Sequence, residues 1–146
     1  MDQAFRRMNS AFRLSRATQS FRETFREEVV KASKLSIDVR DGFLWQGDVK
    51  RVRVSAPVEG VKESFRPIEH IPPEEIRRAM LLVAGHSLGL REGALLNETA
   101  RLLGFKRMGA NILTSLRSVY EKARGDGALA LEDGLVIMVG AGNERT

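Results

Sequence analysis

Apolar residues in the second half of the chain recur every three or four positions in three successive stretches, which predicts three amphipathic helices. Their apolar stripes are Ile76, Met80 and Val83; Leu96, Ala100 and Leu103; and Ile112, Leu116, Val119, Tyr120 and Ala123. Pro73, followed by Glu74 and Glu75, is typical of a helix start, because proline lacks an N–H that the first turn leaves unpaired and acids favour the positive end of the dipole. Gly85 and Gly104 are typical of helix ends.

The pattern changes after residue 127. The stretch ALALEDGLVIMV, residues 128–139, predicts a β-hairpin that turns at Asp133 and Gly134, a dipeptide typical of two-residue turns. The apolar residues expected to face one another in this hairpin are Leu129, Leu131, Leu135, Ile137 and Val139. Three helices followed by a hairpin predict a winged helix over residues 70–140, in which the third helix can enter the major groove of DNA.

The N-terminal third repeats part of this pattern. Residues 16–32, RATQSFRETFREEVVKA, align without a gap on residues 107–123, RMGANILTSLRSVYEKA, so that their apolar positions coincide. One inserted residue later, the Asp-Gly pair at 41 and 42 falls on the pair at 133 and 134. This indicates an internal repeat of about 92 residues. A coincidence of spacing between amphipathic helices is the alternative explanation.

The predicted fold class is therefore mainly α with β-hairpin wings (α+β), with one complete winged helix-turn-helix preceded by a partial one. The partial repeat, residues 1–46, has a second helix, a third helix and a hairpin but no first helix. Residues 47–69 are expected to form a connector with one basic strand, VKRVRV, and residues 141–146 a flexible tail. The missing helix suggests either that Met1 is a fragment boundary or that another element or another chain supplies the helix. In the second case we expect a homodimer that buries Phe21, Phe25 and Val29.

Three motifs resemble a known family. GFLW at 42–45, RPIEHIPPEEIRRAM at 66–80 and ETARLLGFKRMGANI at 98–112 look like the poorly characterised C-terminal region of large bacterial helicase-related proteins that have a superfamily-one core. The resemblance covers most of the chain and is strongest over residues 40–123. It implies winged-helix-like repeats attached to a nucleic-acid motor, with any ATPase or helicase activity outside this chain.

Composition limits the chemistry and the compartment. The chain has 146 residues, 42% of them apolar, and no cysteine, which is typical of a globular protein of a reducing compartment, so the cytoplasm is expected. No apolar run reaches the roughly 18 residues that cross a bilayer, and no membrane partner is expected. The first 21 residues, rich in Arg and Ser, are also typical of a mitochondrial transit peptide, but the repeat accounts for them as a helix.

Positive charge points to nucleic acid. The net charge is +5, and residues 1–36 carry eight basic and four acidic side chains, which is the electrostatic pattern of a surface that binds phosphates. The residues expected to contact nucleic acid are Arg16, Arg22, Arg26, Lys31, Lys106, Arg107, Asn111, Thr114, Arg117, Ser118 and Lys122. We expect binding of DNA through backbone phosphates, with the N-terminal set contributing more. Low sequence specificity is expected because glutamates at 23, 27, 28 and 121 dilute both sets. A solvated charged face, or a protein-interaction or dimerisation module, is the alternative.

Catalytic motifs are weak. No phosphate-binding loop of the type GxxxxGK[ST] occurs, so ATP hydrolysis by this chain is not expected. Asp38 followed by Asp48-Val49-Lys50 resembles the carboxylates and lysine with which many nucleases hold Mg²⁺, but about one such triplet is expected by chance in a chain of this composition. We therefore predict a non-catalytic protein that uses no cofactor, no metal ion and no small-molecule substrate.

Overall fold

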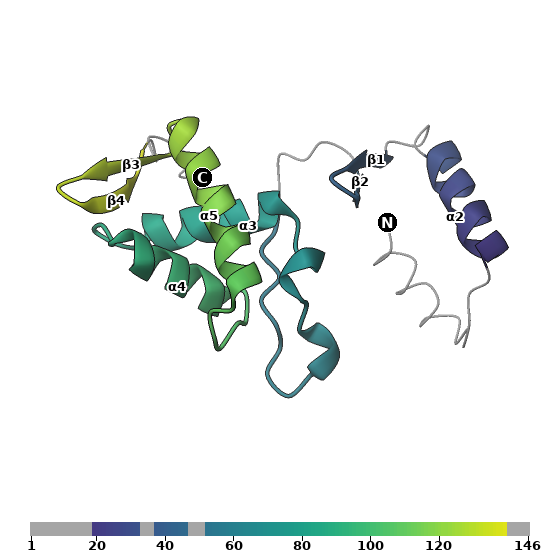
Figure 1. Cartoon of the computed structure of the whole chain (residues 1–146), viewed down its shortest axis with the longest axis horizontal. Coiled ribbons are helices and arrows are strands. Elements are labelled where there is room, and N and C mark those ends of the chain that lie inside the picture. The colour runs from purple at the N-terminus through teal and green to yellow at the C-terminus, as the bar shows by residue number, and fades with distance from the viewer. Residues whose placement is uncertain (1–18, 33–36, 47–51, 140–146) are drawn as a thin grey trace, which may run out of the picture. The chain divides into compact units, whose positions relative to one another are not determined.

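The computed structural model of the chain describes residues 19–32, 37–46 and 52–139. The chain divides into two compact units, Met1–Arg51 and Val52–Thr146. In both units an α-helix is followed by a two-stranded antiparallel hairpin (Figure 1). The predicted α+β class is therefore confirmed.

The first unit contains helix α2 (Gln19–Ala32) and strands β1 (Ile37–Arg40) and β2 (Phe43–Gln46). The two strands are antiparallel and pair up to the residues that flank the turn. Asp41 and Gly42, which form the turn, both have positive φ, 48° and 79°. Two successive residues with positive φ are typical of the two-residue turn whose twist matches that of paired strands.

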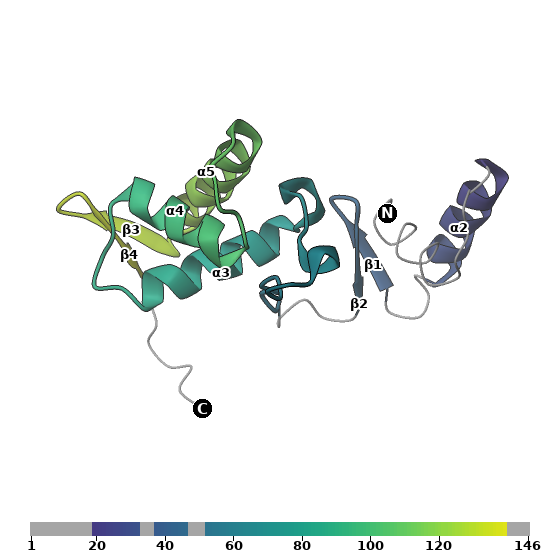
Figure 2. The same cartoon turned by 90° about the horizontal axis from the view of Figure 1, so that it is seen from below.

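The second unit contains three helices and a hairpin, as the apolar pattern predicts (Figures 1 and 2). The helices are α3 (Pro73–Gly85), α4 (Glu92–Leu102) and α5 (Ala110–Gly125). The strands are β3 (Leu129–Glu132) and β4 (Leu135–Met138), which are antiparallel. Each helix contacts the other two, and the hairpin packs against all three of them.

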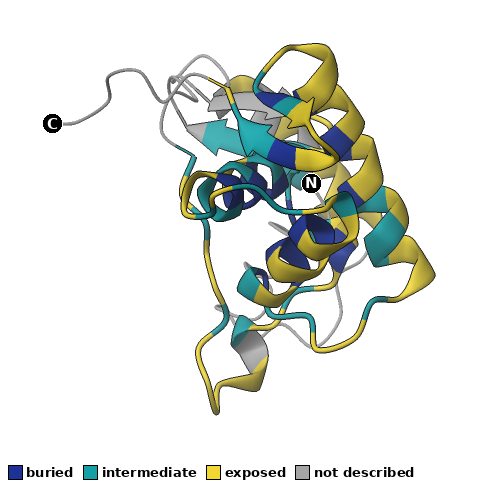
Figure 3. Ribbon diagram, turned by 90° about the vertical axis from the view of Figure 1, so that its left-hand side faces the viewer, coloured by how far each residue is buried: buried dark blue, intermediate teal, exposed yellow. Residues whose placement is uncertain are grey.

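The core of the second unit lies where the three helices and the hairpin meet (Figure 3). Its most deeply buried side chains are Ala79, Met80, Leu95, Leu116, Tyr120, Ala123 and Val136. The predicted stripes of α4 and α5 are buried, except that Ile112 is only half-buried. Burying a leucine or methionine side chain contributes about 1.5–3 kcal/mol each, so this shared core is the main source of the unit's stability.

A two-residue bridge ties the loop between α3 and α4 to the hairpin. Leu90 N–H donates to the Val136 carbonyl at 3.2 Å, and Val136 N–H donates to the Leu90 carbonyl at 2.7 Å. The loop thereby lies along β4 as a short third strand. The order across this small sheet is the loop, β4 and β3.

The predicted facing of side chains in this hairpin is wrong. The turn has two residues, Asp133 and Gly134, so Leu131 pairs with Val136 and Leu129 pairs with Met138. Residues that pair directly share a face, so Leu129 and Leu131 lie with residues 136 and 138, not with 135, 137 and 139. Only Leu129 and Val136 are buried in the hairpin strands. The sequence pattern misled because both faces of the hairpin carry apolar residues.

Residues 52–72, called the arm below, precede α3 and contain the short 3₁₀ helices η3 (Lys62–Ser64) and η4 (Ile68–His70). Residues 52–54 are not in a strand, and the rest of the predicted VKRVRV strand lies outside the described residues. Val54 packs on the core of the second unit, and Ile68 and Ile71 are buried in it. The described part of the predicted connector is thus an integral part of the second unit.

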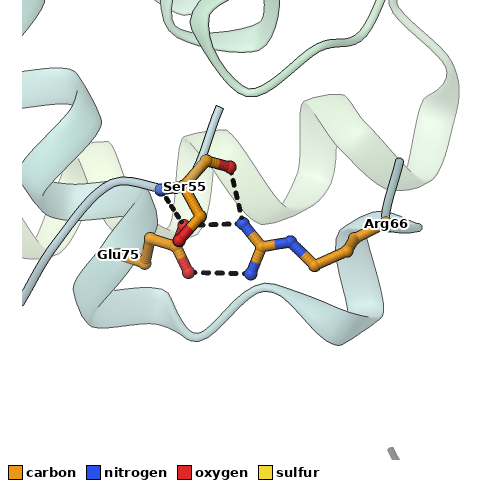
Figure 4. A network of polar contacts seen from close by, with 3 residues as sticks. All are labelled: Ser55, Arg66 and Glu75. Carbon is orange, nitrogen blue, oxygen red and sulfur yellow. Dashed lines mark hydrogen bonds and ion pairs between the residues drawn. The ribbon is translucent and has the colours of Figure 1, made fainter. Parts of the chain in front are cut away.

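A buried ion pair fixes the arm to α3 (Figure 4). Arg66 donates to both carboxylate oxygens of Glu75, at 2.9 Å and 2.6 Å, and also to the Ser55 carbonyl at 3.0 Å. Ser55 N–H donates to Glu75 Oε1 at 2.8 Å. The carboxylate and one edge of the guanidinium therefore have hydrogen-bond partners, which allows this acid to be buried in the first turn of α3.

The arm also packs closely on the turn between α4 and α5. Gly104, at the end of α4, has a φ of +94°, and a Cβ placed on it would lie 2.2 Å from Pro57 Cγ. Phe105 N–H donates to the Ala100 carbonyl at 2.9 Å and closes the last turn of α4. Glycine is required at this position both by its left-handed conformation and by the approach of the arm.

The helix and hairpin of the first unit recur in the second at the predicted spacing. Helix α2 begins 91 residues before α5, and β1 and β2 begin 92 residues before β3 and β4. The helix predicted upstream of α2 lies in residues 1–18, outside the described residues. The predicted tail, residues 141–146, lies outside them as well.

Candidate nucleic-acid interface

Helix α5 presents a polar stripe to solvent on the side opposite the core. The predicted contact residues on it are Asn111, Thr114, Arg117, Ser118 and Lys122, and all five are exposed. Their spacing of three or four positions places them on one face of the helix. The buried stripe and the polar stripe both repeat with the period of the α-helix. They are offset from each other around the helix axis, so one faces the core and the other faces solvent.

Two further predicted residues, Lys106 and Arg107, are exposed in the turn that leads into α5. From this turn to the end of the helix, residues 106–125, the chain has five basic side chains and one acidic side chain, Glu121. The turn and the helix together therefore form a positive surface. We call this surface, residues 106–122, the α5 face.

Two acids from elsewhere in the second unit reach the α5 face. Asn111 Nδ2 donates to Glu69 Oε1 at 3.2 Å, which links α5 to η4 of the arm. Arg117 Nε lies 3.9 Å from Glu92 Oε1 of α4, and the two side chains are 61% and 43% exposed. A surface pair of this kind contributes little, so Arg117 can exchange its partner, whereas a base contact by Asn111 would replace an existing hydrogen bond. The sequence gives no local signal for either acid.

The C-terminal end of α5 is anchored by charge. Asp126, directly after the helix, accepts hydrogen bonds from both terminal nitrogens of Arg77 in α3, the second at 3.2 Å. The hydrogen bond from Arg77 lowers the pKa of the Asp126 carboxyl below its ordinary value. The Arg124 guanidinium lies 5.8 Å from the centre of the Tyr120 ring. Lys122 and Arg124 also face the negative end of the helix dipole, so part of this basic character stabilises the helix itself.

The predicted residues of the N-terminal set belong to the first unit. Arg16 lies outside the described residues, as does the side chain of Arg26. Arg22 is exposed, and Lys31 is exposed and donates to Glu28 Oε1 at 2.7 Å. This hydrogen bond raises the pKa of the Lys31 ammonium above its ordinary value.

The charges of α2 itself cancel. Within Gln19–Ala32 the sequence has three basic residues and three glutamates. The positive excess of the N-terminal third therefore comes from residues outside this helix. Of the two predicted sets, that of the α5 face is described completely, and all seven of its residues are exposed.

The residues predicted to form a dimer are only partly described. Phe25 is half-buried, and the side chains of Phe21 and Val29 lie outside the described residues. The homodimer that buries them stays a prediction.

The residues considered for nuclease chemistry are also largely outside the description. Asp38 lies in β1, its side chain is not described, and residues 48–50 are not described at all. Among the residues that the structure does describe, no group of three or more His, Cys, Asp or Glu is placed to hold a metal ion. Within the same residues, no helix combines the length and the apolar character needed to cross a membrane.

Comparison of the chain with protein-family models, with curated proteins and with solved structures finds no match.

Proposed function

We propose that the second unit is a winged-helix module that binds nucleic acid without catalysing a reaction, as an accessory region of a helicase-related protein. In this proposal α3, α4 and α5 are the three helices, β3 and β4 form the wing, and α5 meets the duplex. The bridge between Leu90 and Val136 supports the assignment, because it ties the loop between the first two helices to the hairpin. The link to a helicase rests on the sequence resemblance alone.

The observation that carries the proposal is the composition of the α5 face. Lysine and arginine at 106 and 107 in the turn, and at 117 and 122 on the helix, are exposed, as are the short hydroxyls of Thr114 and Ser118. Basic side chains and hydroxyls are the groups that most often contact the phosphates and sugars of DNA. Four basic side chains on one face can neutralise about four phosphates, which gives a salt dependence with a log–log slope of about −3.6.

Low sequence specificity follows from the same surface. Asn111, the α5 side chain best suited to read a base edge, is engaged by Glu69. Thr114 and Ser118 are too short to make the bidentate contacts that distinguish bases strongly. Binding through phosphates is then the main contribution, and DNA duplexes of different sequence should bind alike.

The test is a titration of the full chain into fluorescein-labelled DNA duplexes of two unrelated sequences, followed by anisotropy between about 50 and 200 mM salt. We expect a log–log slope of about −3 to −4 and affinities for the two sequences within about threefold of each other. An RNA duplex of the same length measures the preference for DNA. An association constant that does not change with salt would refute the proposal.

A further inference from the structure

The hairpin of the second unit has the opposite charge character from the α5 face. Residues 126–139 contain three acids and no lysine or arginine. Asp126 is paired with Arg77, but Glu132 and Asp133, at the turn, are exposed and form no ion pair within the described part of the chain. Acidic side chains repel the negatively charged phosphate backbone, so this hairpin is poorly suited to bind nucleic acid.

The same hairpin exposes apolar side chains. Leu131, Leu135 and Val139 are 49%, 37% and 48% exposed, and Leu88, in the loop that bridges to β4, is fully exposed. These four are the majority of the seven large apolar side chains that are exposed among the described residues. Gly89 brings the loop against the hairpin, since a Cβ on it would lie 3.2 Å from Leu135 Cβ. By the register given above, Leu131 lies on one face of the hairpin and Leu135 on the other, so apolar side chains are exposed on both faces of this hairpin.

The outer edge of β3 is open. Val136 exchanges two hydrogen bonds with Leu90, so in β4 the backbone of residue 136 points away from β3. Leu131 is its direct partner in the hairpin, and in an antiparallel pair of this kind both residues direct N–H and C=O outward. Among the described residues no strand or bridge lies beyond β3. The N–H and C=O of Leu131 therefore offer an unpaired edge.

We propose that this edge binds an extended protein segment with alternating apolar and basic residues, which adds to the sheet as a strand beside β3. Backbone hydrogen bonds to Leu131 would hold the segment in register. Successive residues of a strand point to opposite faces, so Leu131 and Glu132 present an apolar side chain on one face and a carboxylate on the other. A segment in which apolar and basic residues alternate matches both.

Charge favours a basic protein segment at this edge over a second copy of the chain and over nucleic acid. A second copy of the chain, paired antiparallel through the same edge about a two-fold axis, would place the two acidic turns at opposite ends of the paired strands, and neither hairpin carries a lysine or arginine to meet them. Nucleic acid would meet the same acids. A basic segment is attracted by these acids. The docking site is separate from the α5 face, so peptide binding at β3 and nucleic-acid binding at α5 can fail independently.

The probe is a capped octapeptide of alternating valine and arginine, titrated into the full chain labelled with ¹⁵N. We expect shifts of amide signals at 129–132, protection of the Leu131 amide from hydrogen exchange, and no binding of the matched peptide in which glutamate replaces arginine. Glu132→Lys should weaken binding by tenfold or more, whereas Glu98→Lys, at an exposed acid of α4, should not. Leu131→Pro removes the outward N–H and should abolish binding, with the dispersion of the remaining amide signals reporting that the unit still folds.

Three results would overturn the proposal. The first is equal binding of the valine–arginine peptide to the parent chain, to Glu132→Lys and to Glu98→Lys, which would show attraction by net charge alone. The second is a change of the 129–132 signals with protein concentration in the absence of peptide, which would make a second copy the occupant. The third is perturbation of the same signals by a DNA duplex but not by the peptide.

Discussion

The two helix–hairpin segments of this chain, α2 with β1–β2 and α5 with β3–β4, have the same turn and a spacing that differs by one residue, but the contacts that stabilise them differ. Helix α5 packs against α3 and α4 and is tied to the arm through Asn111 and to α3 through Asp126. The side-chain hydrogen bonds described for α2, such as Lys31 to Glu28, join residues three or four positions apart. The local sequence pattern therefore gives a helix and a hairpin in both copies. A core built by long-range contacts is described only for the second copy.

Two single residues allow the segments to be followed separately. The chain has one tryptophan, Trp45 in β2, and one tyrosine, Tyr120 in α5. Trp45 is half-buried, and Tyr120 is buried in the core of the second unit. Tryptophan fluorescence excited at long wavelength thus reports on the first unit, and the tyrosine signal in near-ultraviolet circular dichroism reports mainly on the second.

The largest expected difference concerns the aligned pair Leu116 and Phe25. Leu116 is fully buried, so Leu116→Ala should lower the free energy of unfolding at the tyrosine signal by about 2–5 kcal/mol. Phe25 is half-buried, and Phe25→Ala should cost less at the tryptophan signal. Urea unfolding of both variants measures this. Equal losses would mean that the first copy has a core as complete as that of the second.

The next difference is between a buried ion pair and an exposed one. The side chains of Glu75 and Arg66 are only 7% and 15% exposed, so Glu75→Ala should destabilise the second unit by about 3 kcal/mol because it leaves Arg66 buried without its partner. Glu28→Ala removes the exposed partner of Lys31 and should cause no measurable loss. Thermal unfolding at the two signals checks both. A stable Glu75→Ala variant would show that the arm does not depend on this pair.

The two turns should respond equally. Gly42 and Gly134 have φ values of 79° and 77°, and a Cβ on either would meet nothing within 4 Å. Alanine in this left-handed conformation costs about 1 kcal/mol, so Gly42→Ala and Gly134→Ala should destabilise their hairpins to the same extent. Amide hydrogen exchange in each hairpin measures the loss. A clear difference between them would show that the turns are held by their surroundings rather than by their own conformation.

The smallest effect is the acid response of the second unit. The hydrogen bond from Arg77 lowers the pKa of the Asp126 carboxyl below its ordinary value. A carboxyl whose pKa is lower in the folded state stabilises that state above its unfolded pKa, and the contribution disappears as the pH falls through the folded pKa. Asp126→Asn should therefore narrow the stability difference between pH 6 and pH 3 slightly. A larger pH dependence in Asp126→Asn than in the parent chain would contradict the sign.

The sequence predicted the elements well because their signals are local. Proline and glutamates at the start of α3, glycine after α4 and the two Asp-Gly turns each act within a few residues, and the structure has each element where the pattern places it. The buried stripe of α5 follows from its period of 3.6 residues. These signals depend on no distant residue.

What could not be predicted depends on contacts between distant residues. The bridge of Leu90 to Val136 and the capture of Asn111 by Glu69 join positions more than 40 residues apart. The facing of the β3–β4 hairpin was also predicted wrongly, but for a local reason: both of its faces carry apolar residues, and the pairing that the two-residue turn imposes was not applied to them. The exposure of the predicted α5 residues follows from the period of the helix, but Glu69 and Glu92, which reach two of them, could not be predicted.

The central claim is that the α5 face, rather than α2, meets phosphates. The most direct measurement compares the salt dependence of duplex binding for two matched double variants, Lys106→Glu with Lys122→Glu and Arg22→Glu with Lys31→Glu, which change the net charge equally. The α5 variant should lose about two units of log–log slope and tenfold or more in affinity, while the α2 variant should keep a slope close to that of the parent chain. An equal or larger loss from the α2 variant would contradict the account and place the main contact surface in the first unit.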